Sequence, residues 1–417
     1  MNIFQISAVL LTLTALFSYL NHRFIGLPTT IGVMLFALLM SLILFVSGYV
    51  DPIVHQWAVA MLEQIDFNQT LLHGMLSFLL FAGALHTNLD DLFEQRWVVA
   101  SLASVGVILC TFIVAGLSYF VLDLLGLPMP FIYCLLFGAL IAPTDPIAVL
   151  GILKTANAPK SLETKITGES LFNDGIGVVV FLVLLGIAAG GHDVTPTSIT
   201  ILFVQEAVGG AILGFVLGWL TYKMLKNIDN YQIEVLLTLA LVVGGYALAG
   251  ALHLSAPIMV VIAGLMIGNH GRRMAMTDKS REHLDMFWEL VDEILNAVLF
   301  VLIGLEMIVL TVTGNILLAA LLAIPLVLFA RFISVGIPIT ALRLGRDFTP
   351  NVIKVLTWGG LRGGISVALA LSIPEGPYRD TILTITYAIV IFSIVVQGLT
   401  IGPMVRRLVK EPEENNA

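Results

Sequence analysis

Apolar runs of about 20 residues recur along this chain, and they constrain its fold more than any other feature. A helix of about 20 residues is long enough to cross a hydrocarbon core of about 30 Å. In lipid, each backbone N–H and C=O must be paired within the protein, and a helix achieves this within one segment. The alternating pattern of an outer-membrane barrel is absent from the sequence. We therefore predict an all-α polytopic membrane protein.

The composition supports this prediction. Hydrophobic residues make up 58% of the 417 residues and charged residues only 12%, whereas a soluble protein has about 25% charged residues. Cys110 and Cys134 both lie in apolar runs, so no disulfide framework is expected. The sequence has no glycine-rich phosphate loop and no soluble catalytic domain. We therefore expect no cofactor, no nucleic-acid partner and no enzymatic activity.

Thirteen ranges are predicted to span the membrane. They are residues 3–20, 28–48, 69–87, 97–121, 130–153, 164–190, 198–222, 232–252, 256–270, 286–312, 315–342, 351–373 and 380–405. With the N-terminus outside, this count places all but three of the 20 basic residues in cytoplasmic loops or at cytoplasmic helix ends. Such segregation follows the positive-inside rule, so we expect a multi-pass protein of the cell membrane with a cytoplasmic C-terminus.

Two of these ranges are interrupted near their middles. The fifth contains Pro-Thr-Asp-Pro at residues 143–146, and the twelfth contains Gly-Gly-Leu-Arg-Gly-Gly at residues 359–364. Proline removes a helical donor, and paired glycines loosen a helix. Because the two lie seven spans apart, they cross the membrane in opposite directions. The spacing predicts inverted six-helix repeats with two crossed discontinuous helices, the fifth and the twelfth, around a transporter's midplane site.

The sixth range carries a group of polar residues on one helix face, namely Glu169, Ser170, Asn173 and Asp174. Asp174 lies about ten residues in from the cytoplasmic start of the range, which is roughly 15 Å deep at the rise of an α-helix. This depth is the middle of the bilayer. A charge at that depth is expensive and indicates a functional site.

These residues have the chemistry of a monovalent cation site. A dehydrated cation needs several oxygen ligands, and Asp174, Asp145, Ser170 and Thr144 supply carboxylate, hydroxyl and freed carbonyl oxygens. A carboxylate there is neutralised by a proton or by a cation, but not by both. That competition is the mechanism of an antiporter. The alternative is that the acids only pair with buried arginines and hold helices together.

Two arginines are predicted to lie at membrane depth. Arg331 needs a nearby carboxylate, and Glu169 is the first candidate by depth, with Glu306 as the second. Arg362 lies at the second interruption, where it can offset the partial negative charge of helix C-termini. Asp145 can do the reverse for the half-helix that begins at Pro146. We expect both arginines to have structural roles.

Three more acids lie at the cytoplasmic end of the tenth range, namely Glu289, Asp292 and Glu293. They form either a solvated helix face or a negative cytoplasmic funnel that concentrates cations.

Three motifs together resemble a known family. They are GESLFNDG at residues 168–175, APTDP at residues 142–146 and GGLRGG at residues 359–364. The chain is similar to the CPA1 branch of monovalent cation/proton antiporters, which contains the NhaP-type proteins and the eukaryotic sodium/proton exchangers. The resemblance covers nearly the whole chain. It implies an NhaA-like antiporter fold, a homodimer in the lipid bilayer and elevator-type alternating access.

The resemblance also implies a division of the chain. The parts are residues 1–96 (interface helices 1–3), 97–190 (core helices 4–6), 191–228 (linker helix 7), 229–312 (interface helices 8–10), 313–407 (core helices 11–13) and 408–417 (a short cytoplasmic tail).

The residue roles that the resemblance implies follow the motifs. Asp174 would bind the cation, Na⁺ or Li⁺, and the proton, with Ser170, Asp145 and Thr144 as further ligands. Asn173 would hold the interruption of the fifth range, and Glu169 would pair with Arg331. The Asn-Asp pair is the mark of the electroneutral branch, in which one proton is exchanged for one cation.

The sequence departs from many relatives at Ala82, where they have a glutamate. An acidic helper is therefore absent from this point of the ion path, which leaves K⁺/H⁺ or mixed exchange open as an alternative. Two other functional classes are an ion channel and an intramembrane aspartyl protease that would use Asp145 and Asp174. Against the protease, Asp174 follows Asn in FNDG and not a GxGD pattern.

Overall fold

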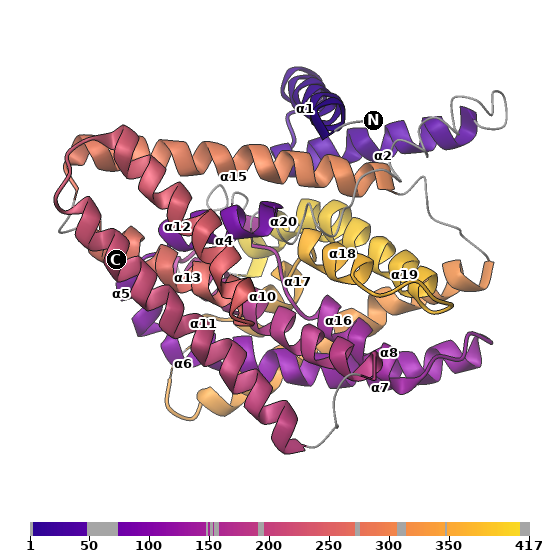
Figure 1. The fold of residues 1–417 in the computed structure, drawn as a ribbon. Helices are drawn as coiled ribbons and strands as arrows, with labels where there is room; N and C mark the ends of the chain where they lie inside the picture. The colour runs from indigo at the N-terminus through magenta and orange to yellow at the C-terminus, as the bar shows by residue number, and fades with distance from the viewer. Residues whose placement is uncertain are drawn as a thin grey trace, which may run out of the picture.

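The computed structural model describes residues 3–47, 74–146, 149–150, 153, 158–190, 196–271, 276–306, 314–346 and 348–408. Within these ranges the regular structure is helical, apart from one antiparallel backbone bridge between Asp145 and Leu361 (Figure 1). The fold is therefore all-α, as the apolar runs predict.

The described helices run in chain order from α1 to α20. The first half holds α1 (Ile3–Leu20), α2 (Thr29–Ser47), α4 (Leu76–Leu85), α5 (Leu89–Glu94), α6 (Arg96–Ser101), α7 (Val107–Leu124), α8 (Phe131–Ile141) and α10 (Lys160–Ala188). The second half holds α11 (Pro196–Leu225), α12 (Tyr231–Ala251), α13 (Ala256–Met266), α15 (Asp278–Glu306), α16 (Gly314–Leu342), α17 (Val352–Gly359), α18 (Gly364–Leu371), α19 (Arg379–Phe392) and α20 (Gly398–Leu408). Four π-helical turns continue α1, α6, α13 and α19, namely η1 (Asn21–Ile25), η3 (Leu102–Gly106), η4 (Ile267–Gly271) and η5 (Ser393–Gln397).

By length and composition, seven helices in the described residues can cross a membrane, and four further apolar helices are shorter. Each of the thirteen predicted ranges overlaps a described helix. The boundaries differ most at the tenth range, where α15 begins at Asp278 and not at residue 286. The polar residues before the apolar run continue the same helix, because hydropathy marks where lipid begins and not where a helix begins.

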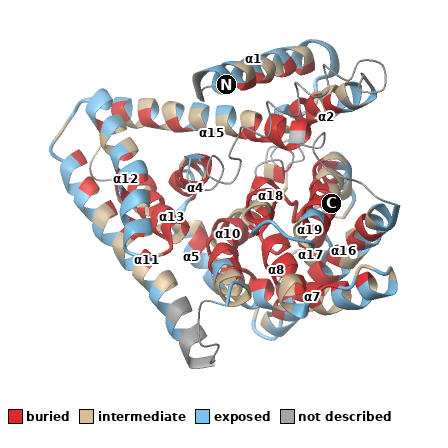
Figure 2. Cartoon of the chain, turned by 45° about the vertical axis from the view of Figure 1, so that its right-hand side comes forward, coloured by how far each residue is buried: buried red, intermediate tan, exposed pale blue. Residues whose placement is uncertain are grey.

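Exposed residues lie on the outward faces of the helices (Figure 2), and many of the exposed residues are large and apolar. Phe120 of α7 is 72% exposed and Leu236 of α12 is 64% exposed. Such exposure is unfavourable in water but expected where lipid is the solvent, since lipid tails are as apolar as a leucine side chain. The exposed surface therefore agrees with the predicted membrane location.

The helices pack in two groups on either side of α10 (Figures 1 and 2). One group contains α4, α11, α12 and α13, and the other contains α7, α8, α16, α18 and α19. Helix α10 contacts both groups, since Leu171 joins the core of the first group and Phe181 joins that of the second. The polar face of α10 therefore lies between the two groups.

Both predicted interruptions are present. Helix α8 ends at Ile141, before the two prolines, and α17 ends at Gly359, with four residues between it and the start of α18. Gly360 has φ −76° and ψ 69°, and Leu361 N donates to Gly359 O at 2.9 Å, which together form an inverse γ-turn. The twelfth range is thus two short helices joined by extended backbone.

Candidate functional site

The two interruptions contact each other through their backbones. Asp145 N donates to Leu361 O at 2.8 Å. In continuous helices, the Asp145 N–H would bond to Ile141 O, and Leu361 O would accept from Ile365 N. The interruptions free these two groups, and each satisfies the other, so neither is left unpaired at membrane depth. This bond fixes the position of Asp145 relative to the second interruption.

Helix α10 satisfies the remaining freed groups of the first interruption. The Asn173 amide accepts from Thr144 N at 3.2 Å and donates to Thr144 Oγ1 at 2.9 Å. Ser170 Oγ donates to Thr144 O. Asn173 and Ser170 are 0% and 1% exposed. The predicted role of Asn173 as a support for this interruption thus corresponds to two hydrogen bonds.

A close approach of α10 to the first interruption makes these bonds geometrically feasible. A Cβ atom at Gly177 would overlap the ring of Pro143, and one at Gly175 would lie 2.8 Å from Ile258 Cγ1 of α13. Any larger residue at these positions would push α10 away from its neighbours. The glycines that follow Asp174 in the motif therefore serve packing.

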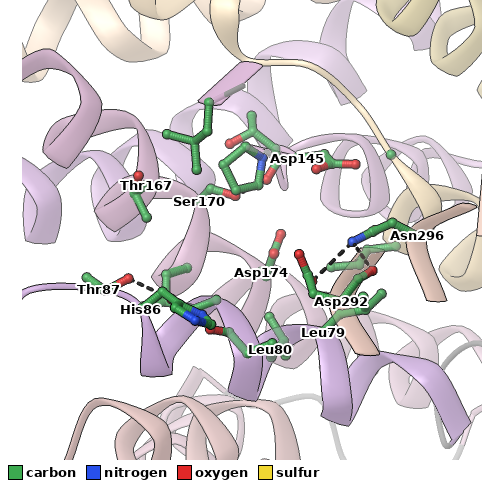
Figure 3. Close-up of a pocket in the computed structure, with 18 of the residues that line it drawn as sticks. Leu79, Leu80, His86, Thr87, Asp145, Thr167, Ser170, Asp174, Asp292 and Asn296 are labelled. Atoms are coloured by element: carbon green, nitrogen blue, oxygen red, sulfur yellow. Dashed lines mark hydrogen bonds between the residues drawn. The ribbon is translucent and has the colours of Figure 1, made fainter. Parts of the chain in front are cut away.

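Asp174 and Asp145 share one cavity of about 790 Å³ (Figure 3). Asp174 is 6% exposed, and no side chain in the described part of the chain donates a hydrogen bond to its carboxylate. Ser170 and Thr144 line the same cavity. Two carboxylates with hydroxyl and carbonyl oxygens form a donor set that suits a hard monovalent cation. No three His, Cys, Asp or Glu side chains of the described residues are grouped to hold a metal ion by themselves.

The cavity walls are acidic. The acids that line the cavity are Asp91, Asp145, Glu163, Asp174, Asp285, Glu289, Asp292 and Glu293. Lys160 also lines it, but its ammonium is paired with Asp91 at 2.7 Å. The structure thus brings the predicted funnel residues of α15 into the same cavity as Asp174. A negative cavity of this kind raises the local concentration of cations.

Asn296 of α15 was not predicted from the sequence. Its Nδ2 donates to Asp292 Oδ1 at 3.1 Å and to Asp292 O at 2.8 Å, and both residues line the cavity (Figure 3). The amide orients the carboxylate within the acidic wall. The spacing of four residues from Asp292 is the signal that could have identified Asn296.

The two membrane arginines have different surroundings. Arg331 Nη1 contacts Glu169 Oε1 at 2.5 Å, with side chains 5% and 2% exposed. This pair lies outside the cavity lining. The side chain of Glu306, the second candidate partner, is outside the part of the chain that the structure describes. The pair therefore neutralises two buried charges away from the cavity.

Arg362 is 2% exposed and donates from Nη1 to Gly360 O at 2.5 Å. Gly360 is the residue that caps the C-terminus of α17. The guanidinium thus lies at the negative end of a helix dipole, which is the position expected from the sequence.

Ala82 is fully buried in α4 and lines the cavity. Its carbonyl oxygen lies 2.8 Å from His86 Nδ1. Ala82 therefore contributes no acidic group to the cavity wall.

The comparisons with known proteins agree with this geometry. Residues 10–407 match the family model described as sodium/hydrogen exchanger, transmembrane. The Na⁺/H⁺ antiporter NhaP of Pseudomonas aeruginosa is 54% identical over 96% of both chains. The Na⁺/H⁺ antiporter NhaH of Halobacillus dabanensis is 35% identical over 82% of this chain and 84% of its own.

A solved structure has the same fold. The sodium proton antiporter MjNhaP1 of Methanocaldococcus jannaschii matches with a TM-score of 0.75 at 19% identity, over 99% of this chain and 100% of the other.

Proposed function

Because the chain belongs to the sodium/hydrogen exchanger family, as its three motifs predict, we propose that it is a secondary-active Na⁺/H⁺ antiporter. The observation that carries the proposal is the pair Asp174 and Asp145 at the contact of two interrupted helices, open to one acidic cavity. The relatives with high identity are named as antiporters. No observation favours the protease or the channel.

The exchange step follows from the surroundings of Asp174. Its carboxylate has no hydrogen-bond donor in the described part of the chain, so it is neutralised by whatever enters the cavity. A proton and a Na⁺ ion exclude each other at this carboxylate. Asn173 cannot titrate, and its amide is engaged with Thr144. One cation is then exchanged for one proton, without net charge movement.

The cation ligands are proposed to be Asp174, Asp145, Ser170 and Thr144. Ser170 Oγ donates a hydrogen bond to Thr144 O, and Ser170 and Thr144 both line the cavity beside the two carboxylates. A cation that takes these oxygens as ligands replaces its lost water shell. Li⁺ is a second substrate of such an oxygen site. K⁺ remains the alternative, because Ala82 leaves the α4 wall without an acid.

The architecture of the proposal is a homodimer with thirteen spans in inverted repeats, with the N-terminus outside and the C-terminus in the cytoplasm. Residues 97–190 and 313–407 form the core that moves in an elevator cycle against residues 1–96 and 229–312, with residues 191–228 as the linker. The packing of α7 and α8 with α16 and α19 supports a joint core. The contact between the two interruptions supports the same grouping.

The first test is Asp174→Asn. The amide keeps the size of the side chain but binds neither a proton nor a cation by charge, so Na⁺-driven proton movement in everted vesicles is expected to fall to background. Asp123→Asn, at an exposed position near the end of α7, is the matched control and should exchange as the wild type does. Normal exchange by a well-produced Asp174→Asn protein contradicts the proposal.

The second test addresses the ion and the stoichiometry. In proteoliposomes, Na⁺, Li⁺ and K⁺ are each offered against a proton gradient with the membrane potential clamped at several values. We expect Na⁺ and Li⁺ to drive proton movement at rates that do not change with the potential, because a one-for-one exchange moves no net charge. A rate that rises with the potential contradicts the stoichiometry, and a K⁺ rate equal to the Na⁺ rate favours the alternative substrate.

A further inference from the structure

The second interruption is held by two polar side chains of η5, Ser393 and Gln397. We propose that these two are positioning residues for the cation site and act on Asp145 through the backbone of the interruption. The inference rests on the proposed function, since it concerns the same site. It gives a role in ion binding to a segment that lines no part of the cavity.

The second interruption frees two backbone groups that a continuous helix would pair. In a continuous helix, Arg362 N would donate to Trp358 O, four residues earlier. Instead, Arg362 N donates to Ser393 Oγ at 2.9 Å, and Trp358 O accepts from Gln397 Nε2 at 2.9 Å. The side chains of Ser393 and Gln397 thus replace the missing helical hydrogen bond: one pairs with its donor, Arg362 N, and the other with its acceptor, Trp358 O.

The two side chains are also bonded to each other. Ser393 Oγ donates to Gln397 Oε1 at 2.7 Å. The four groups form one chain, from Arg362 N through Ser393 and Gln397 to Trp358 O. Ser393 and Gln397 are 0% and 3% exposed, so no water competes for these bonds. In an apolar region, a buried polar group without a partner is costly, and the complete chain is therefore a firm constraint.

The π-helical turn places this pair. Gly398 N donates to Ser393 O, five residues earlier, so the turn is wider than an α-helical turn at this point. Ser393 and Gln397 are the first and last residues of that turn. A π-helical turn inside an α-helix is frequently found at functional sites.

The first interruption is held in the same way. Ser170 and Asn173 of α10 bond to Thr144 O and Thr144 N, just as Gln397 and Ser393 bond to Trp358 O and Arg362 N. In each case a hydroxyl and an amide from one neighbouring helix satisfy freed groups of the interruption. Ser170 and Asn173 hold a residue of the proposed ligand shell, Thr144. Ser393 and Gln397 are the equivalent pair at the second interruption.

The link from η5 to the cation site is short. Leu361 lies between the two anchored residues Trp358 and Arg362, and its carbonyl accepts from Asp145 N. On the other side of Arg362, a Cβ atom at Gly363 would overlap the carboxylate of Asp145. Both the backbone and the side chain of Asp145 therefore contact the segment to which Ser393 and Gln397 are hydrogen-bonded. A shift of that segment moves the proposed ligand Asp145, although Ser393 and Gln397 themselves do not contact the cation.

The test uses Ser393→Ala and Gln397→Met in the full-length protein in proteoliposomes. Each variant removes one anchor, so we expect the apparent KM for Na⁺ to rise about three- to tenfold, while the rate at saturating Na⁺ stays within about twofold of the wild type. The double variant should be no worse than the more affected single variant, because both side chains belong to one hydrogen-bonded chain.

Thr386→Val is the matched control. Thr386 is fully buried in α19, and its hydroxyl donates to Ile382 O of its own helix. Thr386 is as deeply buried as Ser393, but its hydroxyl bonds within its own helix and not to the interruption, so the KM of the Thr386→Val variant should equal that of the wild type. If Gln397→Met is not produced as folded protein, Ser393→Ala, which removes only one hydroxyl group, decides the inference by itself.

A second readout does not depend on transport. Na⁺ that binds the folded protein raises its unfolding temperature in detergent, and the Na⁺ concentration that gives half of this rise should increase in parallel with the KM. Unchanged KM values in the folded variants, or a lower unfolding temperature with unchanged Na⁺ dependence, overturn the inference. Failure of the wild type to exchange Na⁺ for protons contradicts the proposed function instead, and the Na⁺-dependent unfolding temperature then still decides the positioning role.

Discussion

Single residues on the polar face of α10 have three separate tasks. Asn173 and Ser170 satisfy backbone groups of the first interruption, Asp174 faces the cavity without a donor in the described residues, and Glu169 pairs with Arg331 away from the cavity. Neighbouring side chains on one helix therefore differ in their hydrogen-bond partners and in the groups that neutralise their charges. The two acids of this face, Glu169 and Asp174, differ in role because their surroundings differ.

Arg331→Gln tests the structural task of the buried pair. The change leaves the Glu169 carboxylate buried without its counter-charge, so we expect a loss of about 3–5 kcal/mol in stability and poor production of folded protein. Thermal unfolding in detergent measures it. Glu169→Gln combined with Arg331→Gln removes both charges and should recover part of the loss.

The control for this prediction is Arg379→Gln. Arg379 lies 4.0 Å from Glu375, which is almost fully exposed, so the loss of that ion pair should change the stability by less than about 1 kcal/mol. A small effect of Arg331→Gln, similar to that of Arg379→Gln, would show that Glu169 finds another partner.

At the level of elements, the two interruptions form a single unit. The bond from Asp145 N to Leu361 O joins them, α10 holds the first, and η5 holds the second. Helices that end at membrane depth normally leave unpaired carbonyl and amide groups. In this molecule several of these groups at the two breaks pair with each other or with neighbouring side chains.

Gly363→Ala tests how closely the interruptions fit. The added methyl would overlap the Asp145 carboxylate, so one of the two segments must move. We expect Na⁺-driven exchange to fall at least tenfold while the protein remains folded, measured by vesicle assays and size-exclusion profiles. Gly116→Ala in α7 is the control, because a Cβ there meets no atom within 4 Å. Wild-type exchange by Gly363→Ala would mean that the geometry of Asp145 tolerates this displacement.

The sequence predicts where the two interruptions lie, but not which side chains pair with their freed backbone groups. Proline and paired glycine have fixed effects on a helix, so the positions of both interruptions could be predicted from residue types alone. The partners of the freed groups could not, because they depend on the rotation of α10 and η5 about their axes. Ser393 and Gln397 lie in a range that is apolar by hydropathy, and a single hydroxyl or amide there also occurs in helices without any function.

Across the whole molecule, charge is distributed in a way that the net value of −8 does not convey. Eight acids gather on the walls of one cavity, whereas the buried arginines lie outside it. The sequence predicts three of the four α15 acids on these walls, Glu289, Asp292 and Glu293, since they lie within five residues, but not Asp285 one turn earlier. It does not predict that Asp91 and Glu163 join them, because that requires α5 and α10 to meet α15 around a common space.

Glu289→Gln combined with Glu293→Gln tests the acidic wall. Removing two charges lowers the local Na⁺ concentration, so at low ionic strength we expect the apparent KM for Na⁺ to rise about two- to fivefold with an unchanged maximum rate. At higher ionic strength, set with choline chloride, the difference should shrink as screening increases. Glu375→Gln, at an exposed position outside the cavity, is the control. A KM difference that does not depend on ionic strength would instead assign these acids direct contact with the ion.

The backbone bond between Asp145 and Leu361 also has a consequence for how the protein is made. The two residues lie about half the chain apart, so the first interruption is synthesised long before its partner exists. A nascent chain that has emerged only through α10 already contains Thr144, Asn173 and Ser170, but the acceptor Leu361 O does not exist yet. The backbone contact between the two interruptions can therefore form only after the chain has been synthesised beyond α17.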